Sequence, residues 1–406
     1  MRLGKKLSDE MRNEDLNQSN NKKTIAVVGA GPIGKIAAIH LAQTGDEIVL
    51  IGPSPPEDAR TTAIMDDGIK MLDTINVWPS LKDHAAALRS MRIVDGTKRL
   101  IRTPEARYDA SEIGLEAFGY NIQNRNLNTT LEQELNNCWN IQWVREFFED
   151  IKLSNTTQKT LNCASGKTVN ADLIVAADGR NSRIRDLLQI KTKAWSYPQT
   201  ALVLNVEHTR PHDNVSTEFH TESGPFTLVP LPGKRSSLVW VEKPEQAAEI
   251  VDWDDEHLAR FMSEKSHHLL GDLKPLTRPV SFPLSGLMAS QFGKDGTVLI
   301  GETGHAFPPI GAQGMNLGIR DVRTLYELLS SQKHGADMAA LAGAYSTARK
   351  SDVRLRTGAV DLLNRSLLTD FLPIHLGRGL GLYASEKVPF FRKFLMSRGL
   401  GTQPIT

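Results

Sequence analysis

A Gly-x-Gly-x-x-Gly motif at residues 29–34 constrains the fold more than any other feature of the sequence. It follows a short apolar, β-branched run at 24–28 and precedes a helical stretch at 35–43, and a second apolar run at 47–51 completes a β-α-β unit. Glycines at this spacing permit a tight turn and a close approach of backbone to a pyrophosphate at a helix N-terminus. The motif therefore predicts a doubly wound α/β domain that binds a dinucleotide.

The end of the second apolar run departs from the usual pattern for such a domain. An acidic residue commonly stands there and holds the ribose hydroxyls, whereas this chain has Gly52. Glu57 or Asp58 could substitute, but charges in a Pro-rich loop are more typically solvated. We therefore interpret both as loop charges, and the ribose contact stays open.

A second motif follows the apolar run 171–177, which delivers Asp178-Gly179 at the carboxyl end of a strand, where α/β sheets bind ligands. Asp178 could orient a hydroxyl or a backbone amide near the pyrophosphate. Alternatively, Asp178-Gly179 is only a turn that ends the strand, with Ser182 as the cap of the next helix. The residues alone leave both interpretations open.

The third motif, at 298–321, is the most specific. A strand ends in an acidic residue, Glu302, and a Pro-Pro loop and a Gly-rich entry to a second helix follow. Gly311, Gly314 and Gly318 would let the backbone approach a flat ligand closely. The N-terminus of the helix would favour electron density on such a ligand.

The rest of the chain suggests a second module. Alternating apolar segments between 197 and 241 predict a sheet with a turn at 230–234, and helical patterning follows between 254 and 274. The run 297–300 looks like a return to the first sheet, and the chain is mostly helical from 339 onward. With 48 Lys and Arg against 47 Asp and Glu, the net charge of +1 gives no reason to expect a nucleic-acid partner.

In this order, the motifs resemble the FAD-dependent aromatic hydroxylases of the para-hydroxybenzoate hydroxylase type, and among them the ubiquinone-biosynthesis hydroxylases. The resemblance runs from about residue 23 to the C-terminus. It is carried by the stretches 29–34, 60–63, 119–125, 178–179 and 309–316, together with Trp78.

The resemblance implies roles for individual residues. Arg60 matches an arginine that contacts the flavin cofactor, and Asn124 matches a polar position along it. Asp178 matches an aspartate that serves both FAD and the nicotinamide cofactor, and Glu302 stands where an aspartate usually holds the ribityl chain. The full expected FAD site is Gly29, Ala30, Gly31, Gly34, Arg60, Asn124, Asp178, Gly301, Glu302, Pro309, Gly311, Gly314, Met315 and Asn316.

The fold implied is α/β, with a Rossmann-like FAD-binding domain, a β-sheet substrate domain and a C-terminal helical region. We expect a disordered arm at 1–22. The FAD-binding domain is expected to be discontinuous, at 23–76, 95–190 and 278–345, with a substrate domain at 77–94 and 191–277 and the helical region at 346–406.

The activity implied is hydroxylation of the aromatic ring of a polyprenylated phenol, with NAD(P)H as reductant and O₂ as oxygen source. The cofactor carries the chemistry, so we name no catalytic residue and no metal ligand, and we interpret His305 as a loop histidine packed below the flavin. The alternatives are a flavin monooxygenase of a small soluble aromatic compound and a non-catalytic quinone- or lipid-binding accessory protein.

A prenylated substrate resides in membrane, yet no apolar run here reaches the length of a bilayer span. We expect a cytoplasmic protein, with peripheral contact to the inner membrane or to a quinone-biosynthesis complex as a further hypothesis. The candidate surface is the cluster of leucine, phenylalanine, arginine and lysine side chains at 362–395, although an ordinary amphipathic helix packed on protein explains the same pattern.

Overall fold

The computed structural model describes residues 22–97, 105–152, 158–308, 312–332, 337–368, 392–393 and 396. The β-α-β unit forms as predicted, and its helix begins at the proline of the glycine-rich motif and ends one residue early. Its strands belong to a six-stranded sheet of order β19-β20-β12-β1-β2-β8, parallel from β20 to β8. The elements are β1 (Thr24–Val28), α2 (Pro32–Ala42), β2 (Glu47–Ile51), β8 (Ile141–Val144), β12 (Leu173–Ala176), β19 (Gly293–Lys294) and β20 (Thr297–Leu299).

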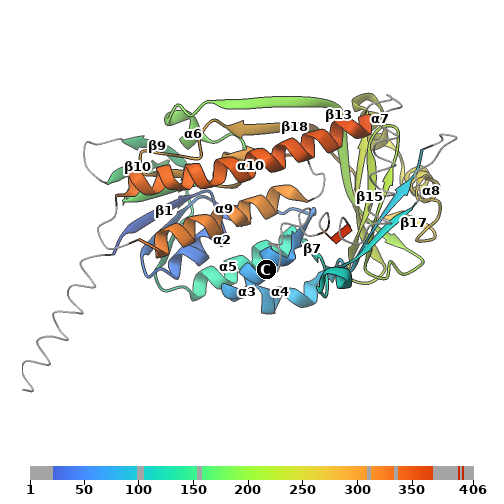
Figure 1. Cartoon of the computed structure of the whole chain (residues 1–406), viewed down its shortest axis with the longest axis horizontal. Helices are drawn as coiled ribbons and strands as arrows, with labels where there is room; N and C mark the ends of the chain where they lie inside the picture. Colours follow the sequence, from blue (N-terminus) through green and yellow to red (C-terminus); the bar gives the residue numbers. More distant parts are fainter. Residues whose placement is uncertain are drawn as a thin grey trace, which may run out of the picture.

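Both faces of this sheet are covered, which explains why its strands are continuously apolar. Ile25 and Val27 of β1 pack into a core with the helices, whereas Ala26 and Val28 face the core beneath a small antiparallel sheet. Figure 1 shows α2, α9 and α10 lying along one side of β1. The covering elements are α3 (Asp66–Thr74), α4 (Trp78–Leu81), α5 (Asn124–Asn137), α9 (Gln313–Ser330), α10 (Met338–Leu368), β9 (Phe148–Lys152), β10 (Lys159–Cys163) and β11 (Thr168–Ala171).

The alternating segments form a second, nine-stranded sheet, covered by two helices over an aromatic-rich core. It is antiparallel except for one pair, β5 with β14, which is parallel. The predicted turn at 230–234 joins β15 to β16. The elements are β5 (Ser90–Asp95), β6 (Ala106–Asp109), β13 (Thr192–His208), β14 (Val215–His220), β15 (Pro225–Leu231), β16 (Arg235–Glu242), β17 (Leu273–Pro275), β18 (Val280–Ala289), β21 (His305–Ala306), α7 (Pro244–Asp252) and α8 (Asp255–Lys265).

The long strands β13 and β18 run from the nine-stranded sheet back over the first one (Figure 1). A three-stranded sheet of β3 (Thr61–Met65), β7 (Gly119–Gln123) and β4 (Ala85–Ala87) completes the described chain, with α6 (Arg183–Leu187) after β12.

The expected domain boundaries stay a proposal. We placed β6 and β18 with the FAD-binding segments, and both hydrogen-bond into the nine-stranded sheet because they pair with β5 and β13. The helix α10 crosses the expected boundary at 345/346. Residues 1–21 of the expected arm lie outside the described residues.

Candidate flavin site

In the glycine motif, Gly29 and Gly34 are required by the packing of the fold, whereas Gly31 borders an uncrowded region. A Cβ at Gly29 would lie 2.2 Å from the carbonyl oxygen of Ala177, and one at Gly34 would lie 1.8 Å from that of Gly29. Around Gly31, no atom of the described residues beyond its chain neighbours lies within 4 Å of such a Cβ. Gly31 also precedes the first residue of α2, and no side chain caps that helix end. The loop therefore presents backbone amides next to an open space, as a pyrophosphate site needs.

The backbone conformation and close packing at position 52 explain why a glycine stands there. Its φ is +147°, and a Cβ there would lie 2.9 Å from the backbone nitrogen of Ala30. The indole of Trp143 donates to the Gly52 carbonyl at 2.8 Å. The Arg145 guanidinium lies 3.5 Å above the Trp143 ring and donates to the Ser54 hydroxyl at 2.7 Å. Any larger residue at 52 would be strained, so no carboxylate stands where the ribose contact was expected.

Arg60 and Asn124 both bond one carboxylate, Asp58, that we misjudged, while their contact with a cofactor stays a prediction. Asp58 accepts from Arg60 Nε at 2.8 Å and from Arg60 Nη2 at 2.8 Å, and it accepts from Asn124 Nδ2 at 2.7 Å. Asn124 Oδ1 in turn accepts from the Thr62 hydroxyl at 2.6 Å. Burial would raise the pKa of Asp58, but the bonds from Arg60 and Asn124 outweigh it and lower that pKa. The interpretation of Asp58 as a solvated loop charge was wrong, whereas Glu57 is exposed.

The structural interpretation of the second motif is confirmed for Ser182, and Asp178 bonds two protein groups. Ser182 caps α6 by accepting from the Arg185 amide at 3.0 Å. Asp178 accepts from the Ile184 amide at 3.2 Å and from the Thr303 hydroxyl at 3.2 Å. Burial raises the pKa of Asp178. The side chain thus ties the end of β12 to the turn after β20, although its contact with a cofactor stays a prediction.

Glu302 of the third motif acts electrostatically on Arg60. The strand β20 ends at Leu299, three residues before Glu302, which lies in the short turn Gly301–Thr303 and is exposed. Glu302 is close enough to Arg60 to contribute, after Asp58, to the raised pKa of that guanidinium. The turn is held open by Gly301, whose φ is +58°. An exposed carboxylate whose charge acts on Arg60 has the chemistry to bind hydroxyls, and its contact with a ribityl chain stays a prediction.

Behind the Gly301 turn lies a fully buried ionic network that the sequence did not reveal. Asp321 of α9 accepts from the Gly301 amide at 2.8 Å and from Arg349 Nε at 2.7 Å, and it bonds His305 Nε2 at 2.7 Å. Burial would raise the pKa of Asp321, but His305 and Arg349 outweigh it and lower that pKa. The hydroxyl of Tyr345 donates to the Leu299 carbonyl at 3.0 Å. His305 therefore belongs to β21 and to this network, not to a loop.

The start of α9 is locked by one side chain. Asn316 accepts from the Met65 amide at 2.8 Å and donates to the carbonyls of Ala63 at 2.9 Å and Ala312 at 2.7 Å. Among the described residues, which do not include 309–311, no side chain caps this helix end and no atom lies within 4 Å of a Cβ at Gly314. The N-terminus of α9 is therefore fixed against β3, and its contact with a flat ligand stays a prediction.

Not every residue of the third motif serves that purpose. A Cβ at Gly318 would lie 2.7 Å from the side chain of Ile33, so this glycine permits close packing of α9 on α2. Our interpretation of Gly318 as a ligand-facing position was therefore wrong. Pro309 and Gly311 lie outside the described residues. Met315 is partly buried, and its backbone contact with the flavin stays a prediction.

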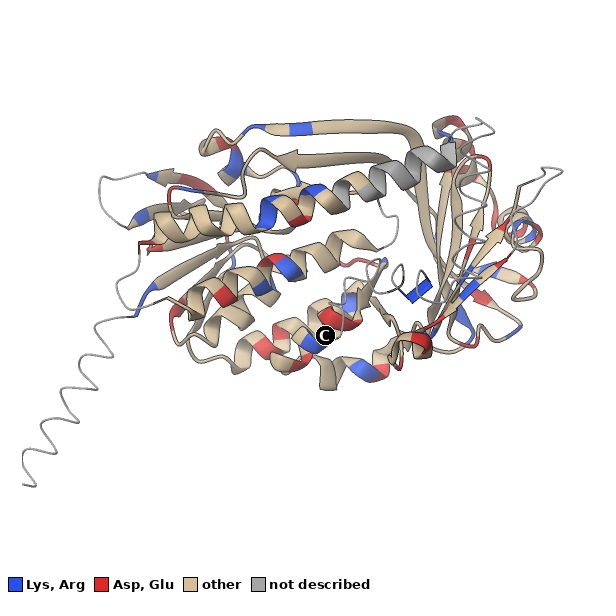
Figure 2. Ribbon diagram, in the orientation of Figure 1, with Lys and Arg blue, Asp and Glu red and all other residues tan. Residues whose placement is uncertain are grey.

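Two further observations bear on partners. In the described part of the chain, no helix is long and apolar enough to cross a membrane. Figure 2 shows both signs of charge interspersed along α5 and α10.

Comparison with known proteins gives a consistent result. Residues 22–356 match the family model described as FAD binding domain. A ubiquinone hydroxylase, UbiL, of Rhodospirillum rubrum is 31% identical over 388 residues, which cover 93% of this chain and 89% of the relative. The 3-demethoxyubiquinol 3-hydroxylase of Escherichia coli is 28% identical, over 94% of this chain and 100% of its own length. The crystal structure of Klebsiella pneumoniae HpxO complexed with FAD and uric acid shares the fold, with a TM-score of 0.75 at 18% identity over 95% of this chain and 98% of that one.

Proposed function

The chain belongs to the FAD binding domain family, and from this premise we propose that it is an FAD-dependent monooxygenase of ubiquinone biosynthesis. It hydroxylates the aromatic ring of a polyprenylated phenol with NAD(P)H and O₂. The observation that carries the proposal is the match to ubiquinone hydroxylases over nearly the whole length of both chains. The uncrowded Gly31 position and the charge of Glu302 acting on Arg60 support it.

Bound FAD would supply the redox chemistry: a hydride from NAD(P)H would reduce it, and it would activate O₂ so that one oxygen atom passes to the ring and the other leaves as water. The residues of the chain bind and orient. The amides of the Gly31 loop bind the pyrophosphate, and Glu302 accepts from the hydroxyls of the ribityl chain. The N-terminus of α9 stabilises negative charge on the pyrimidine edge of the flavin.

Arg60 has a separate task that follows from its surroundings. Its guanidinium is held by Asp58 on one side and lies near Glu302 on the other. It also lies 5.1 Å from the centre of the Phe282 ring. A guanidinium fixed in this way can donate to the cofactor without losing much side-chain entropy on binding. These contacts would hold the guanidinium in place for the cofactor.

We also propose that the substrate reaches the enzyme at a membrane surface or within a complex. The chain would then be peripheral to the inner membrane on the cytoplasmic side. This extension is supported by the apolar and basic residues at 362–395, whose side chains lie outside the described residues except for Arg392 and Lys393. A prenyl tail gains about 0.8 kcal/mol per buried CH₂, so burial of the tail would dominate substrate affinity.

The test is NAD(P)H-dependent hydroxylation of one phenol with and without its prenyl tail, in plain buffer and with lipid vesicles. We expect turnover of the tail-bearing phenol in the presence of vesicles and a much higher KM for the tail-less one. Equal efficiency with the tail-less phenol in plain buffer would contradict the quinone assignment and favour a soluble aromatic substrate. A purified chain without flavin absorbance, even after incubation with FAD, would contradict the monooxygenase itself.

A further inference from the structure

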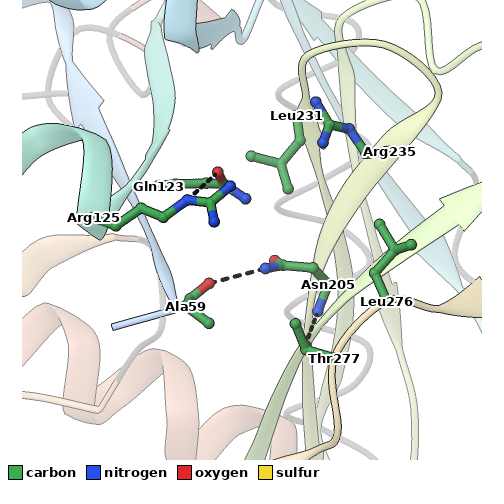
Figure 3. Close-up of a pocket in the computed structure, with 8 residues that line it drawn as sticks. All are labelled: Ala59, Gln123, Arg125, Asn205, Leu231, Arg235, Leu276 and Thr277. Atoms are coloured by element: carbon green, nitrogen blue, oxygen red, sulfur yellow. Dashed lines mark hydrogen bonds between the residues drawn. The ribbon is translucent and has the colours of Figure 1, made fainter. Parts of the chain in front are cut away.

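A cavity of about 200 Å³ lies between the start of α5 and the nine-stranded sheet, beside the Arg60 cluster. Figure 3 shows Arg125 and Gln123 reaching into it from one side and Asn205 and Arg235 from the sheet side. A wider hollow of about 370 Å³ shares Gln123, Arg125 and Arg235 with it. The cavity is lined by Ala59, Gln123, Arg125, Asn205, Leu231, Arg235, Leu276 and Thr277.

The electrostatics of this cavity favour an anion. Arg125 donates Nε to the Gln123 side chain at 3.2 Å, and Arg235 donates Nε to the Pro232 carbonyl at 2.9 Å. Among the residues that the structure describes, both guanidinium groups bond neutral acceptors rather than a carboxylate. The N-terminus of α5 lies at the same place, without a side-chain cap. The wider hollow adds one acid, Asp83, and His84. Two arginines and a positive helix end therefore face one carboxylate, which suits a phosphate group.

The side chain of Asn205 offers a buried acceptor that lacks a hydrogen-bond donor among the described residues. Its side chain is only 5% exposed, and its Nδ2 donates to the Ala59 carbonyl at 2.9 Å. Its Oδ1 is buried without a hydrogen-bond partner in the described part of the chain. Buried acceptors are normally satisfied, because an unsatisfied one is destabilising. A ligand hydroxyl or amide that reaches Asn205 would supply the missing donor, so the cavity fits a ligand that carries both an anionic group and hydroxyls.

The position of the cavity relates it to the flavin site. Ala59, which lines it, stands between Asp58 and Arg60, and Asn124, which precedes Arg125, bonds Asp58. A ligand in the cavity would therefore lie directly beside the residues expected to hold FAD.

We propose that this cavity binds a phosphate group of the reduced nicotinamide dinucleotide, between Arg125 and Arg235. The inference rests on the proposed function, which needs that coenzyme to reach the flavin. A nicotinamide dinucleotide carries phosphates for the two guanidinium groups and ribose hydroxyls for Asn205.

The test compares Arg125→Gln and Arg235→Gln with the wild type and with Arg260→Gln, an exposed arginine on α8 that does not line the cavity. In FAD-loaded protein, the rate of flavin reduction is measured without oxygen against the concentration of NADPH and of NADH. Loss of one charge-assisted bond should raise the half-saturating concentration of coenzyme roughly tenfold to a hundredfold in each cavity variant. The control variant should have the wild-type half-saturating concentration of coenzyme. The FAD dissociation constant and the KM for the aromatic substrate should be unchanged in both cavity variants.

A second arm keeps this inference separate from the proposed function. Calorimetric titration with ADP-ribose and 2′-phospho-ADP-ribose measures binding without any redox step, and we expect Arg235→Gln to weaken it. If NAD(P)H does not reduce the FAD bound to the wild type, the proposed function is contradicted. Binding of ADP-ribose or 2′-phospho-ADP-ribose would still support a phosphate site in the cavity. A wild type that binds neither probe, or cavity variants with unchanged coenzyme constants, would overturn the inference. A raised KM for the aromatic substrate alone would assign the cavity to that substrate instead.

Discussion

Replacing Asp321 by asparagine should destabilise the chain more than removing both charges of its pair with Arg349. The Asp321 side chain is fully buried, and its two oxygens take bonds from Gly301, His305 and Arg349. An asparagine has one acceptor oxygen, so its NH₂ group must face another donor, and the Arg349 guanidinium loses its buried counter-charge. Breaking a buried pair in this way costs about 3–5 kcal/mol.

The double variant Asp321→Asn with Arg349→Met separates the charge effect from the loss of shape. In Asp321→Asn the Arg349 guanidinium keeps only its 2.8 Å ion pair with the partly exposed Asp352. Methionine removes that poorly compensated buried charge and keeps an unbranched side chain of similar reach, so we expect it to recover about 1–3 kcal/mol of the loss. The assay is urea unfolding of the FAD-free chain, followed by tryptophan fluorescence. As a control, Asp272→Asn alters a side chain that is 84% exposed and should stay within about 0.5 kcal/mol of the wild type. A double variant no more stable than Asp321→Asn alone would refute the reasoning.

Three other outcomes follow from the structure. Gly31→Val should fold normally, because a Cβ there meets no atom of the described residues beyond its chain neighbours, but it should lose FAD in a fluorescence titration, because the side chain would fill the space for the pyrophosphate. Gly34→Val should fail to fold, because its Cβ would clash with the Gly29 carbonyl. Normal FAD affinity in Gly31→Val would argue against the pyrophosphate loop. Glu302→Ala should weaken FAD binding by about 1.5–3 kcal/mol while the exposed Glu57→Ala leaves it unchanged, and equal dissociation constants would mean that Glu302 only ends a turn. Burial, with a smaller contribution from the charge of a nearby arginine, lowers the pKa of His40 from 6.5 to about 4. Between pH 6.5 and 4 only the unfolded chain binds the proton at this histidine. About 3 kcal/mol of the free energy of unfolding, present above pH 6.5, should therefore be lost as the pH falls to 4. In urea unfolding, His40→Leu should reduce the dependence of this free energy on pH.

The parts of the fold that the sequence predicted are those with a local signal. The β-α-β unit was placed to within three residues, because apolar runs and glycines at fixed spacing encode it directly. The second sheet was found from alternation and from its turn at 230–234. The helix α7 was missed, although Pro244 at its first position and Glu245 in its first turn are start signals that could have found it.

The contacts that shape the site could be predicted only in part, because they join residues far apart in the chain. Asp58 looked like any loop carboxylate, and only the fold brings Asn124 to it. Asp321 and Arg349 sit on two helices with no pattern that links them, so their pairing is a property of the packing. Resemblance supplied Arg60 and Glu302, whereas only the structure shows that the charge of Glu302 contributes to the raised pKa of Arg60.

The single parallel pair in the nine-stranded sheet has a consequence for how the chain is made. Ser90 of β5 lies opposite Val215 of β14, about 125 residues later. At a synthesis rate of about 5–20 residues per second, β5 leaves the ribosome on the order of ten seconds before its partner exists. During that interval its backbone hydrogen-bonding groups on that edge are unpaired, as in an exposed edge strand. The nascent chain thus passes through a stage at which this strand can pair with the wrong neighbour, and the stage ends only when β14 has emerged.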